Sequence, residues 1–144
     1  ISVMALDISA SALEVARMNG QRCNVDTRMT FMQWDIRRGM PPNIPIPRCI
    51  VSNPPYIPTG DISGLQREVQ GFEPLSALNG GSDGLDFYRE IASSFSPVAG
   101  GLLAFEVGCG QGKSVAEILH QNGYQSIEVL PDLAGRDRVV LGSR

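Results

Sequence analysis

Short apolar runs alternate with amphipathic stretches along this sequence. Six runs that are apolar or alternate in polarity predict β-strands at residues 3–6, 29–33, 49–52, 102–107, 124–130 and 138–141. Three stretches with apolar side chains at helical spacing predict helices at residues 10–22, 83–95 and 112–122. Strands that alternate with helices predict an α/β fold with a mostly parallel sheet, in which the first and third strands are expected to be buried.

Capping and breaking residues set the expected limits of these elements. Ser9 is placed to cap the first helix, and Asn19-Gly20 offers a stop near its end. Residues 37–47 hold four prolines and a glycine and predict a loop. Residues 57–82 are polar, contain glycine and show little periodicity, so we expect a long loop of the kind that is usually functional or disordered.

Polar side chains or glycine follow four predicted strands, at Asp7, Asp35, Asn53 and Gly108. Ligands of parallel sheets bind beyond the carboxyl ends of the strands, so these positions predict a site. Asp7 can bind the diol of a ribose, or it can be a helix-start acid that favours the helix dipole. Asp35 can accept the exocyclic amine of adenine, or it can simply open a loop. Ile36 beside it can cover the adenine ring or pack in the core.

The tetrapeptide Asn53-Pro54-Pro55-Tyr56 leaves the third predicted strand. Its prolines have fixed φ angles and no backbone N–H, so it is a stiff, extended exit from the strand. The carbonyl groups of Asn53 and Pro54 can accept N–H bonds from a flat, amide-like group while Tyr56 stacks on its plane. A plain strand-ending turn is the alternative, because Asn-Pro marks turns in any case.

Composition narrows the classes of function. The 144 residues carry a net charge of −3, which provides no overall basic field for binding nucleic acid. Three cysteines, Cys23, Cys49 and Cys109, have no close pairing, which fits a reducing compartment rather than a disulfide scaffold. With His120 as the one histidine, no Cys/His cluster predicts a zinc site. No apolar run is long enough to span a membrane.

A glycine-rich segment at residues 107–112 lies between a predicted strand and a predicted helix. Such a segment can be the cofactor loop of a permuted enzyme, with Glu128 or Asp132 as the matching acid. Too few residues follow it for the three further strands of a cofactor half, and the earlier strand-end acids already supply a site in the unpermuted order. A tight strand-to-helix turn is therefore the favoured interpretation.

The tetrapeptide and the segments after it resemble the protein-glutamine methyltransferases of peptide-chain release factors, the HemK or PrmC family. The tetrapeptide alone is shared with adenine-N6 and other amino methyltransferases, so it is only moderately specific. A much more specific match is the run Phe72-Glu73-Pro74-Leu75-Ser76-Ala77-Leu78, followed by Gly80-Gly81-Ser82-Asp83-Gly84-Leu85. Residues 105–112 and 138–142 also match, so the resemblance covers nearly the whole chain.

The resemblance implies a class I S-adenosylmethionine-dependent methyltransferase fold, which is Rossmann-like, with S-adenosyl-L-methionine as methyl donor. The cofactor-binding residues that it implies are Asp7 for the ribose, Asp35 with Ile36 for the adenine, and Asn53. It implies that the target glutamine is held by Asn53, Pro54, Pro55 and Tyr56, of which Asn53, Pro54 and Tyr56 are catalytic.

The implied reaction is N5-methylation of the glutamine in the Gly-Gly-Gln motif of release factors. The partner is then a release factor, with no membrane involved and with nucleic acid reached only indirectly, through the ribosome. Two other functions stay open. An adenine-N6 methyltransferase of DNA or RNA needs a basic face with aromatic side chains, which the acidic balance does not favour. A methyltransferase-like module that only binds a partner fits a chain without a cofactor loop.

The family's glycine-rich cofactor loop, first strand and helical amino-terminal domain are expected to precede Ile1, so that residues 1–144 form a partial catalytic domain. That strand is expected between the strand ending at Asp7 and the strand before Asn53. Each neighbour would then lack backbone partners, at about 1–3 kcal/mol per unmade bond. The chain alone is predicted to be unstable or inactive. A bacterial member is expected in the cytoplasm and a eukaryotic one in mitochondria, a choice that these residues do not decide.

Overall fold

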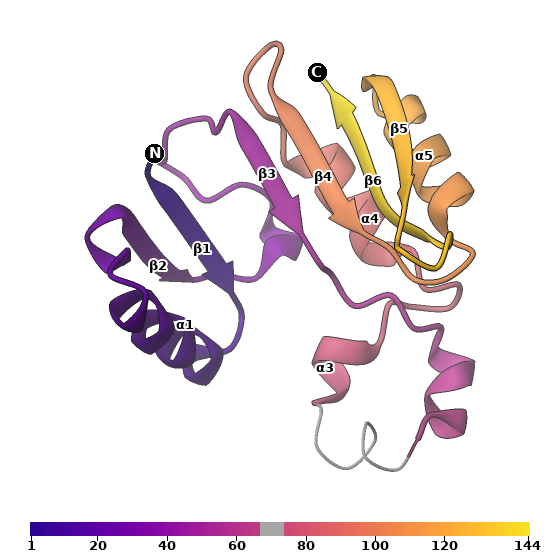
Figure 1. Ribbon diagram of the computed structural model, residues 1–144, viewed down its shortest axis with the longest axis horizontal. Coiled ribbons are helices and arrows are strands. Elements are labelled where there is room, and N and C mark those ends of the chain that lie inside the picture. Colours follow the sequence, from indigo (N-terminus) through magenta and orange to yellow (C-terminus); the bar gives the residue numbers. More distant parts are fainter. Residues whose placement is uncertain (67–73) are drawn as a thin grey trace. The chain divides into compact units, whose positions relative to one another are not determined.

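The structure is a computed structural model that describes residues 1–66 and 74–144 (Figure 1). The chain divides into two compact units, Ile1–Ile44 and Pro45–Arg144, and each is described by itself. Phe72 and Glu73, which open the most specific part of the family resemblance, lie outside the described residues.

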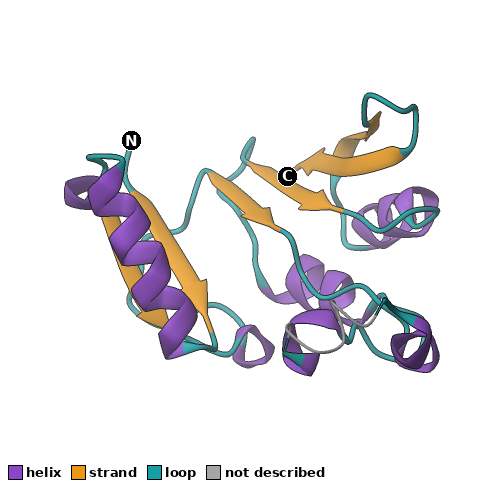
Figure 2. Cartoon of the chain, turned by 60° about the horizontal axis from the view of Figure 1, so that its bottom comes forward, coloured by secondary structure: helices purple, strands orange, loops and turns teal. Residues whose placement is uncertain are grey.

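The first unit is a two-stranded parallel sheet with one long helix packed on it (Figure 2). Its elements in chain order are β1 Val3–Asp7, α1 Ala10–Arg22, the 3-10 helix η1 Asp26–Arg28, β2 Met29–Gln33 and the 3-10 helix η2 Ile36–Arg38. The pairing runs from Val3 opposite Met29 to Asp7 opposite Gln33. The predicted bounds of β1, α1 and β2 are confirmed to within one residue.

Helix α1 begins where the sequence predicts but does not end at Asn19-Gly20. Ser9 is its N-cap, because the Ser9 hydroxyl accepts the N–H of Ala12 at 3.2 Å. Gly20 lies inside the helix and is buried, and an added Cβ would lie only 3.4 Å from the Met29 sulfur. The helix continues past this glycine to Arg22, so the stop that Asn19-Gly20 offers is not used, and an added Cβ would make only ordinary van der Waals contacts.

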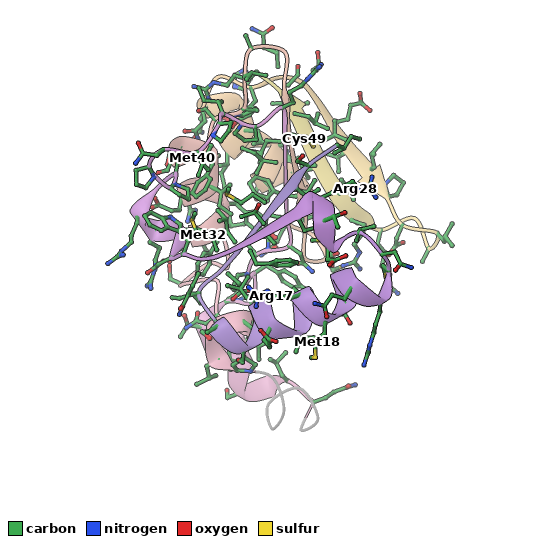
Figure 3. The ribbon with its side chains drawn as sticks, turned by 90° about the vertical axis from the view of Figure 1, so that its left-hand side faces the viewer. Arg17, Met18, Arg28, Met32, Met40 and Cys49 are labelled. Atoms are coloured by element: carbon green, nitrogen blue, oxygen red, sulfur yellow. The ribbon has the colours of Figure 1, made fainter. Side chains whose placement is uncertain are left out.

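One face of α1 is turned to the strands. Leu13 on that face is only 7% exposed. The guanidinium carbon of Arg17 lies 5.3 Å from the centre of the Phe31 ring on β2, which is a cation–π contact. Figure 3 shows Arg17 on the side of α1 nearer the strands and Met18 pointing away from them, where it is 42% exposed. The helix is therefore amphipathic in the way that its sequence predicts.

The second unit is a four-stranded mixed sheet with the strand order β3-β4-β6-β5. Strands β3 and β4 are parallel, whereas β6 is antiparallel to both of its neighbours. The last two strands thus form a hairpin at one edge of the sheet (Figure 1). The elements in chain order are β3 Cys49–Ser52, η3 Thr59–Gly64, α3 Leu75–Leu78, α4 Asp86–Ser94, β4 Leu102–Glu106, α5 Gly112–Gln121, β5 Gln125–Pro131 and β6 Asp137–Ser143.

The core of the second unit lies where α4 and α5 meet the sheet. Tyr88 of α4 is fully buried and contacts Phe105 of β4 edge to face, with ring centroids 5.1 Å apart and planes at 84°. The Tyr88 hydroxyl donates to the Glu106 carbonyl at 3.1 Å. The buried Tyr124 donates in the same way to the Phe95 carbonyl at 3.0 Å. Burial raises the pKa of Tyr88, so this phenol stays a neutral donor.

Three expected boundaries in the second unit differ from the structure. The helix expected from residue 83 begins at Asp86, because the Asp83 carboxylate accepts the Leu85 N–H at 3.1 Å and holds a turn ahead of the helix. The last strand, expected at 138–141, extends from Asp137 to Ser143. Residues 57–82 are not one long loop, because η3 and α3 occupy parts of this stretch.

Strands β1 and β3 are less buried than their apolar sequences predict. Within the described residues, β1 pairs only with β2 and β3 only with β4, so each has one open edge. Val3 is 48% exposed and Val51 is 76% exposed. The prediction that these two strands are buried is wrong for this chain, because a parallel strand becomes buried only when neighbours cover it.

Candidate functional site

The carboxyl ends of β1 and β2 bring two predicted acids to one edge of the first unit. Asp7 lies opposite Gln33, and Trp34 extends the ladder by donating its N–H to the Asp7 carbonyl at 2.9 Å. Asp35 follows directly. The Gln33 side chain donates to the Ile8 carbonyl at 3.0 Å and so ties the two strand ends together.

Asp7 is half-buried, and the backbone orients its carboxylate. Its Oδ1 accepts the N–H of Ser9 at 2.8 Å, in the turn that leads into α1. Its Oδ2 makes no hydrogen bond to a described residue. Because a carboxylate has about four lone-pair sites, Asp7 keeps capacity for a pair of hydroxyls such as a ribose diol. The helix does not need Asp7 as a cap, since Ser9 fills that position.

Asp35 is the N-cap of η2 and is held by Arg37. Its Oδ1 accepts the backbone N–H and the Nε of Arg37 at 3.0 Å each, and its Oδ2 accepts from Nη2 at 2.8 Å. The side-chain hydrogen bonds from Arg37 lower the pKa of Asp35, which keeps the carboxylate ionised. Lone pairs of this ionised group remain for an amine donor. Ile36 is the half-buried first residue of η2.

The tetrapeptide leaves β3 in the second unit with two of its acceptors unpaired. Asn53 is exposed, Pro54 is buried, and Pro55 and Tyr56 are half-buried. Neither the Asn53 side chain nor the Pro54 carbonyl makes a hydrogen bond to a described residue. A backbone acceptor of a buried residue such as Pro54 is normally paired, and the exposed Asn53 side chain can exchange water for another partner. Both groups are therefore available to a donor from a bound molecule.

The residues after the tetrapeptide are held by the segment that follows α3. Ile57 and Asn79 form an isolated parallel bridge. The Ile57 N–H donates to the Leu78 carbonyl at 3.0 Å, and the Gly80 N–H donates to the Ile57 carbonyl at 2.9 Å. The exit of the tetrapeptide therefore has a fixed backbone, although no regular sheet surrounds it.

Three glycines pack against Pro55 and Tyr56. An added Cβ on Gly80 would lie 2.8 Å from the Pro55 carbonyl oxygen, and one on Gly84 would collide with the Tyr56 carbonyl oxygen. An added Cβ on Gly108 would lie 2.9 Å from Tyr56 Cδ2. Side chains cannot approach so closely, so only glycine permits this packing. The sequence places Gly80 in the loop at residues 57–82 and Gly84 in the helix expected at residues 83–95, so it misses this role; the available signal is the cluster of glycines within the run that resembles the family.

The four strand-end positions divide between the two units. Asp7 and Asp35 share one edge of the first unit, and Asn53 and Gly108 follow the neighbouring parallel strands β3 and β4 of the second. Gly108 lies against Tyr56, three residues after Asn53. Each pair is described within its own unit. The residues between β4 and α5 form the tight strand-to-helix turn that the sequence predicts.

The described part of the chain shows no group of His, Cys, Asp or Glu side chains arranged to hold a metal ion. No helix in that part is both long enough and apolar enough to cross a membrane. The three cysteines are free and exposed.

The sequence aligns along its whole length with proteins named release factor glutamine methyltransferase. The protein from Clostridium acetobutylicum is 41% identical over 151 residues, and that from Moorella thermoacetica is 42% identical over 148 residues. These alignments cover 100% and 99% of this chain. The chain is a relative of the release factor glutamine methyltransferases. It spans about half the length of these two relatives, 51% and 50%. No family model matches the chain.

Solved structures share the fold. A methyltransferase from Pyrococcus furiosus matches with a TM-score of 0.66 at 17% identity, covering 99% of this chain and 62% of its own. A SAM-dependent O-methyltransferase from Thermotoga maritima matches with a TM-score of 0.61 at 10% identity, over 99% and 49%. The hMettl16 catalytic domain matches with a TM-score of 0.71 at 12% identity, over 99% and 55%. The predicted class I S-adenosylmethionine-dependent methyltransferase fold is confirmed.

Proposed function

We propose that this chain is part of a methyltransferase that transfers a methyl group from S-adenosylmethionine to a glutamine side chain of a peptide-chain release factor. The acceptor is the N5 amide nitrogen of the Gly-Gly-Gln motif. The observation that carries the proposal is the pair of free acceptors at Asn53 and Pro54, on a loop whose following residues are fixed. Similarity to proteins named release factor glutamine methyltransferase supports glutamine as the planar amide that the loop holds.

The chemical difficulty of this reaction is the nucleophile, because the lone pair of an amide nitrogen is delocalised into its carbonyl. The two N–H groups of the target amide donate to the Asn53 side-chain oxygen and the Pro54 carbonyl. This pairing directs the lone pair out of the amide plane and favours a pyramidal nitrogen, while Tyr56 stacks on the plane. Catalysis then comes from positioning and electrostatics. The nitrogen carries a positive charge after it accepts the methyl group, and in this proposal the proton that it then loses passes to water.

The edge of the first unit fits the nucleoside part of S-adenosylmethionine. When bound, this cofactor supplies an electrophilic methyl group on a sulfonium. The free Oδ2 of Asp7 would hold the ribose hydroxyls, and the ionised Asp35 would accept the adenine amine. Ile36 would cover the adenine ring.

The relatives are about twice as long as this chain, which leaves room for the parts that the proposal still requires. These parts are a glycine-rich cofactor loop, a further strand and an amino-terminal helical domain. The open edges of β1 and β3 are where backbone partners for such a strand are available. Residues 1–144 are then part of a catalytic domain and are inactive by themselves.

The test uses the full-length protein, S-adenosylmethionine and a release factor. Mass spectrometry is expected to find one added methyl group on the Gly-Gly-Gln glutamine. Asn53→Ala should lower kcat by about 100-fold or more and leave the Kd for S-adenosylmethionine within about threefold. Asn19→Ala, which changes an exposed asparagine on α1, is the matched control and should alter neither. The proposal would be refuted if Asn53→Ala left turnover unchanged. It would also be refuted if the protein methylated adenine in RNA or DNA in place of the release factor.

A further inference from the structure

Gln111 joins three segments of the second unit. It directly precedes α5, yet its side chain does not cap that helix. Its backbone N–H donates to the Gly108 carbonyl at 3.1 Å, and its side-chain Oε1 accepts the Gly108 N–H at 3.1 Å. Gln111 therefore pairs with both backbone groups of Gly108 and closes the turn after β4.

The side-chain nitrogen of Gln111 is turned to the tetrapeptide. Nε2 donates to the Tyr56 carbonyl at 2.9 Å and lies 3.4 Å from the Gly84 carbonyl. An amide side chain has two N–H donors and an oxygen acceptor, so all three contacts can exist together. One half-buried side chain thus connects backbone segments that lie 55 and 27 positions away in the sequence.

Two of the glycines that pack against Tyr56, Gly84 and Gly108, also leave space for the Gln111 side chain. An added Cβ on Gly108 would lie 2.7 Å from the Gln111 Oε1, and one on Gly84 would lie 2.8 Å from its Nε2. The peptide bond between Tyr56 and Ile57 is consequently held at both ends. Its carbonyl accepts from Gln111, and its N–H donates to the Leu78 carbonyl at 3.0 Å.

We propose that Gln111 is a positioning residue for the tetrapeptide. It sets the plane of the Tyr56–Ile57 peptide bond, and through that plane the Tyr56 ring and the free acceptors of Asn53 and Pro54. The two prolines have fixed φ angles and keep only ψ free, so the loop has few ways to absorb a rotation at Tyr56, and part of it is passed to Asn53. Gln111 acts on a target amide only through Tyr56. The catalytic side of this inference rests on the proposed function.

Two variants of the full-length enzyme test the proposal. Gln111→Glu keeps an oxygen for the Gly108 N–H but places a second oxygen where Nε2 faces two carbonyls. Gln111→Met keeps the length of the side chain without its hydrogen bonds. Both should lower kcat for release-factor methylation by about 10- to 100-fold, Glu more than Met, and keep the Kd for S-adenosylmethionine within about threefold. Gln125→Glu and Gln125→Met, at an exposed position of β5, are the matched controls and should change neither value.

Hydrogen exchange of the Ile57 amide supplies a readout that does not depend on activity. Both Gln111 variants should speed this exchange about tenfold or more, and the Gln125 variants should not. The positioning role would be overturned by unchanged Ile57 exchange or by an unchanged kcat with only a lower Tm. A parallel loss of kcat and cofactor affinity, or failure of both Gln111 variants to fold, would overturn it as well. If the unmodified enzyme does not methylate the release factor, the proposed function fails, and Ile57 exchange still decides whether Gln111 holds the loop.

Discussion

Replacing Gly84 by alanine tests how tightly the second unit holds Tyr56. Gly84 has a φ of +76°, a left-handed conformation that costs an alanine about 1–2 kcal/mol. The added Cβ would also collide with the Tyr56 carbonyl oxygen and lie 3.2 Å from Pro58 Cδ. Overpacking of this kind costs about 1–3 kcal/mol. Moving the Tyr56 carbonyl away from Gln111 loses a hydrogen bond worth about 1 kcal/mol. Gly84→Ala should therefore destabilise the protein by about 3–6 kcal/mol.

Two other glycines separate the conformational cost of this change from the steric one. Gly123 has a φ of +80° with nothing within 4 Å of an added Cβ, so Gly123→Ala carries only the conformational cost of about 1–2 kcal/mol. Gly64 also has open space but no left-handed φ, so Gly64→Ala should change stability by less than about 1 kcal/mol in either direction.

Urea unfolding of the full-length protein measures all three variants, and a methylation assay follows each. Gly84→Ala should show the largest loss of stability and lose methyl transfer, because the tetrapeptide shifts with Tyr56. Gly123→Ala and Gly64→Ala should keep transfer. If Gly84→Ala costs no more stability than Gly123→Ala, the close packing of Gly84 on Tyr56 is refuted and only its φ matters.

Three further predictions concern the rest of the chain. Tyr124→Phe should lower the free energy of unfolding by about 1 kcal/mol in a urea titration, because it removes the hydroxyl bonded to the Phe95 carbonyl, and it should leave kcat unchanged. The hydrogen bonds from Arg89 hold the pKa of Asp83 below its usual range, so the stability that this pair adds is present above about pH 4 and is lost as the pH falls through the lowered pKa. When the unfolding midpoint is measured against pH, Asp83→Asn should lose less stability below about pH 4 than the unmodified protein does. An equal loss of stability in the two proteins would contradict the pairing. Val51→Asp should destabilise the full-length protein by about 2 kcal/mol or more and residues 1–144 by less than about 1 kcal/mol, because Val51 is 76% exposed here and is covered if β3 gains a partner. Equal small losses by urea unfolding of the two proteins would show that the edge of β3 stays open.

The sequence predicts elements well where a single local rule decides them. The apolar runs of β2 and β3 end where polar residues begin, and Ser9 marks the start of α1, so these bounds agree with the structure. Local rules fail where a contact distant in the sequence decides. Gly20 looks like a helix stop, but it is buried beside Met29 and Phe31 of β2, and the helix continues to Arg22.

In the candidate site, too, the sequence predicts the residues that a local pattern marks and misses those that depend on distant contacts. The strand-end acids Asp7 and Asp35 follow from the pattern of parallel strands, and the structure places both at one edge of the first unit. Gln111 lies in a segment that resembles the family, but the sequence does not reveal its partner, because Tyr56 is 55 positions away and the contact depends on the pairing of β3 with β4. The burial of β1 and β3 was predicted from apolar content alone, which does not say whether partners for both edges are present.

The packing around Tyr56 explains physically why a long run after the tetrapeptide accompanies it. Leu78 and Gly80 pair with the Ile57 backbone, and Gly84 admits the Tyr56 carbonyl beside Gln111. A tetrapeptide without this support would still be a stiff exit from a strand, but the orientation of its acceptors would not be set. The described part of the run therefore holds the backbone that follows the tetrapeptide in place. Under the proposed function, the choice between a protein glutamine and a nucleobase depends on groups beyond the tetrapeptide, because Asn53 and Pro54 offer the same two acceptors to either planar group.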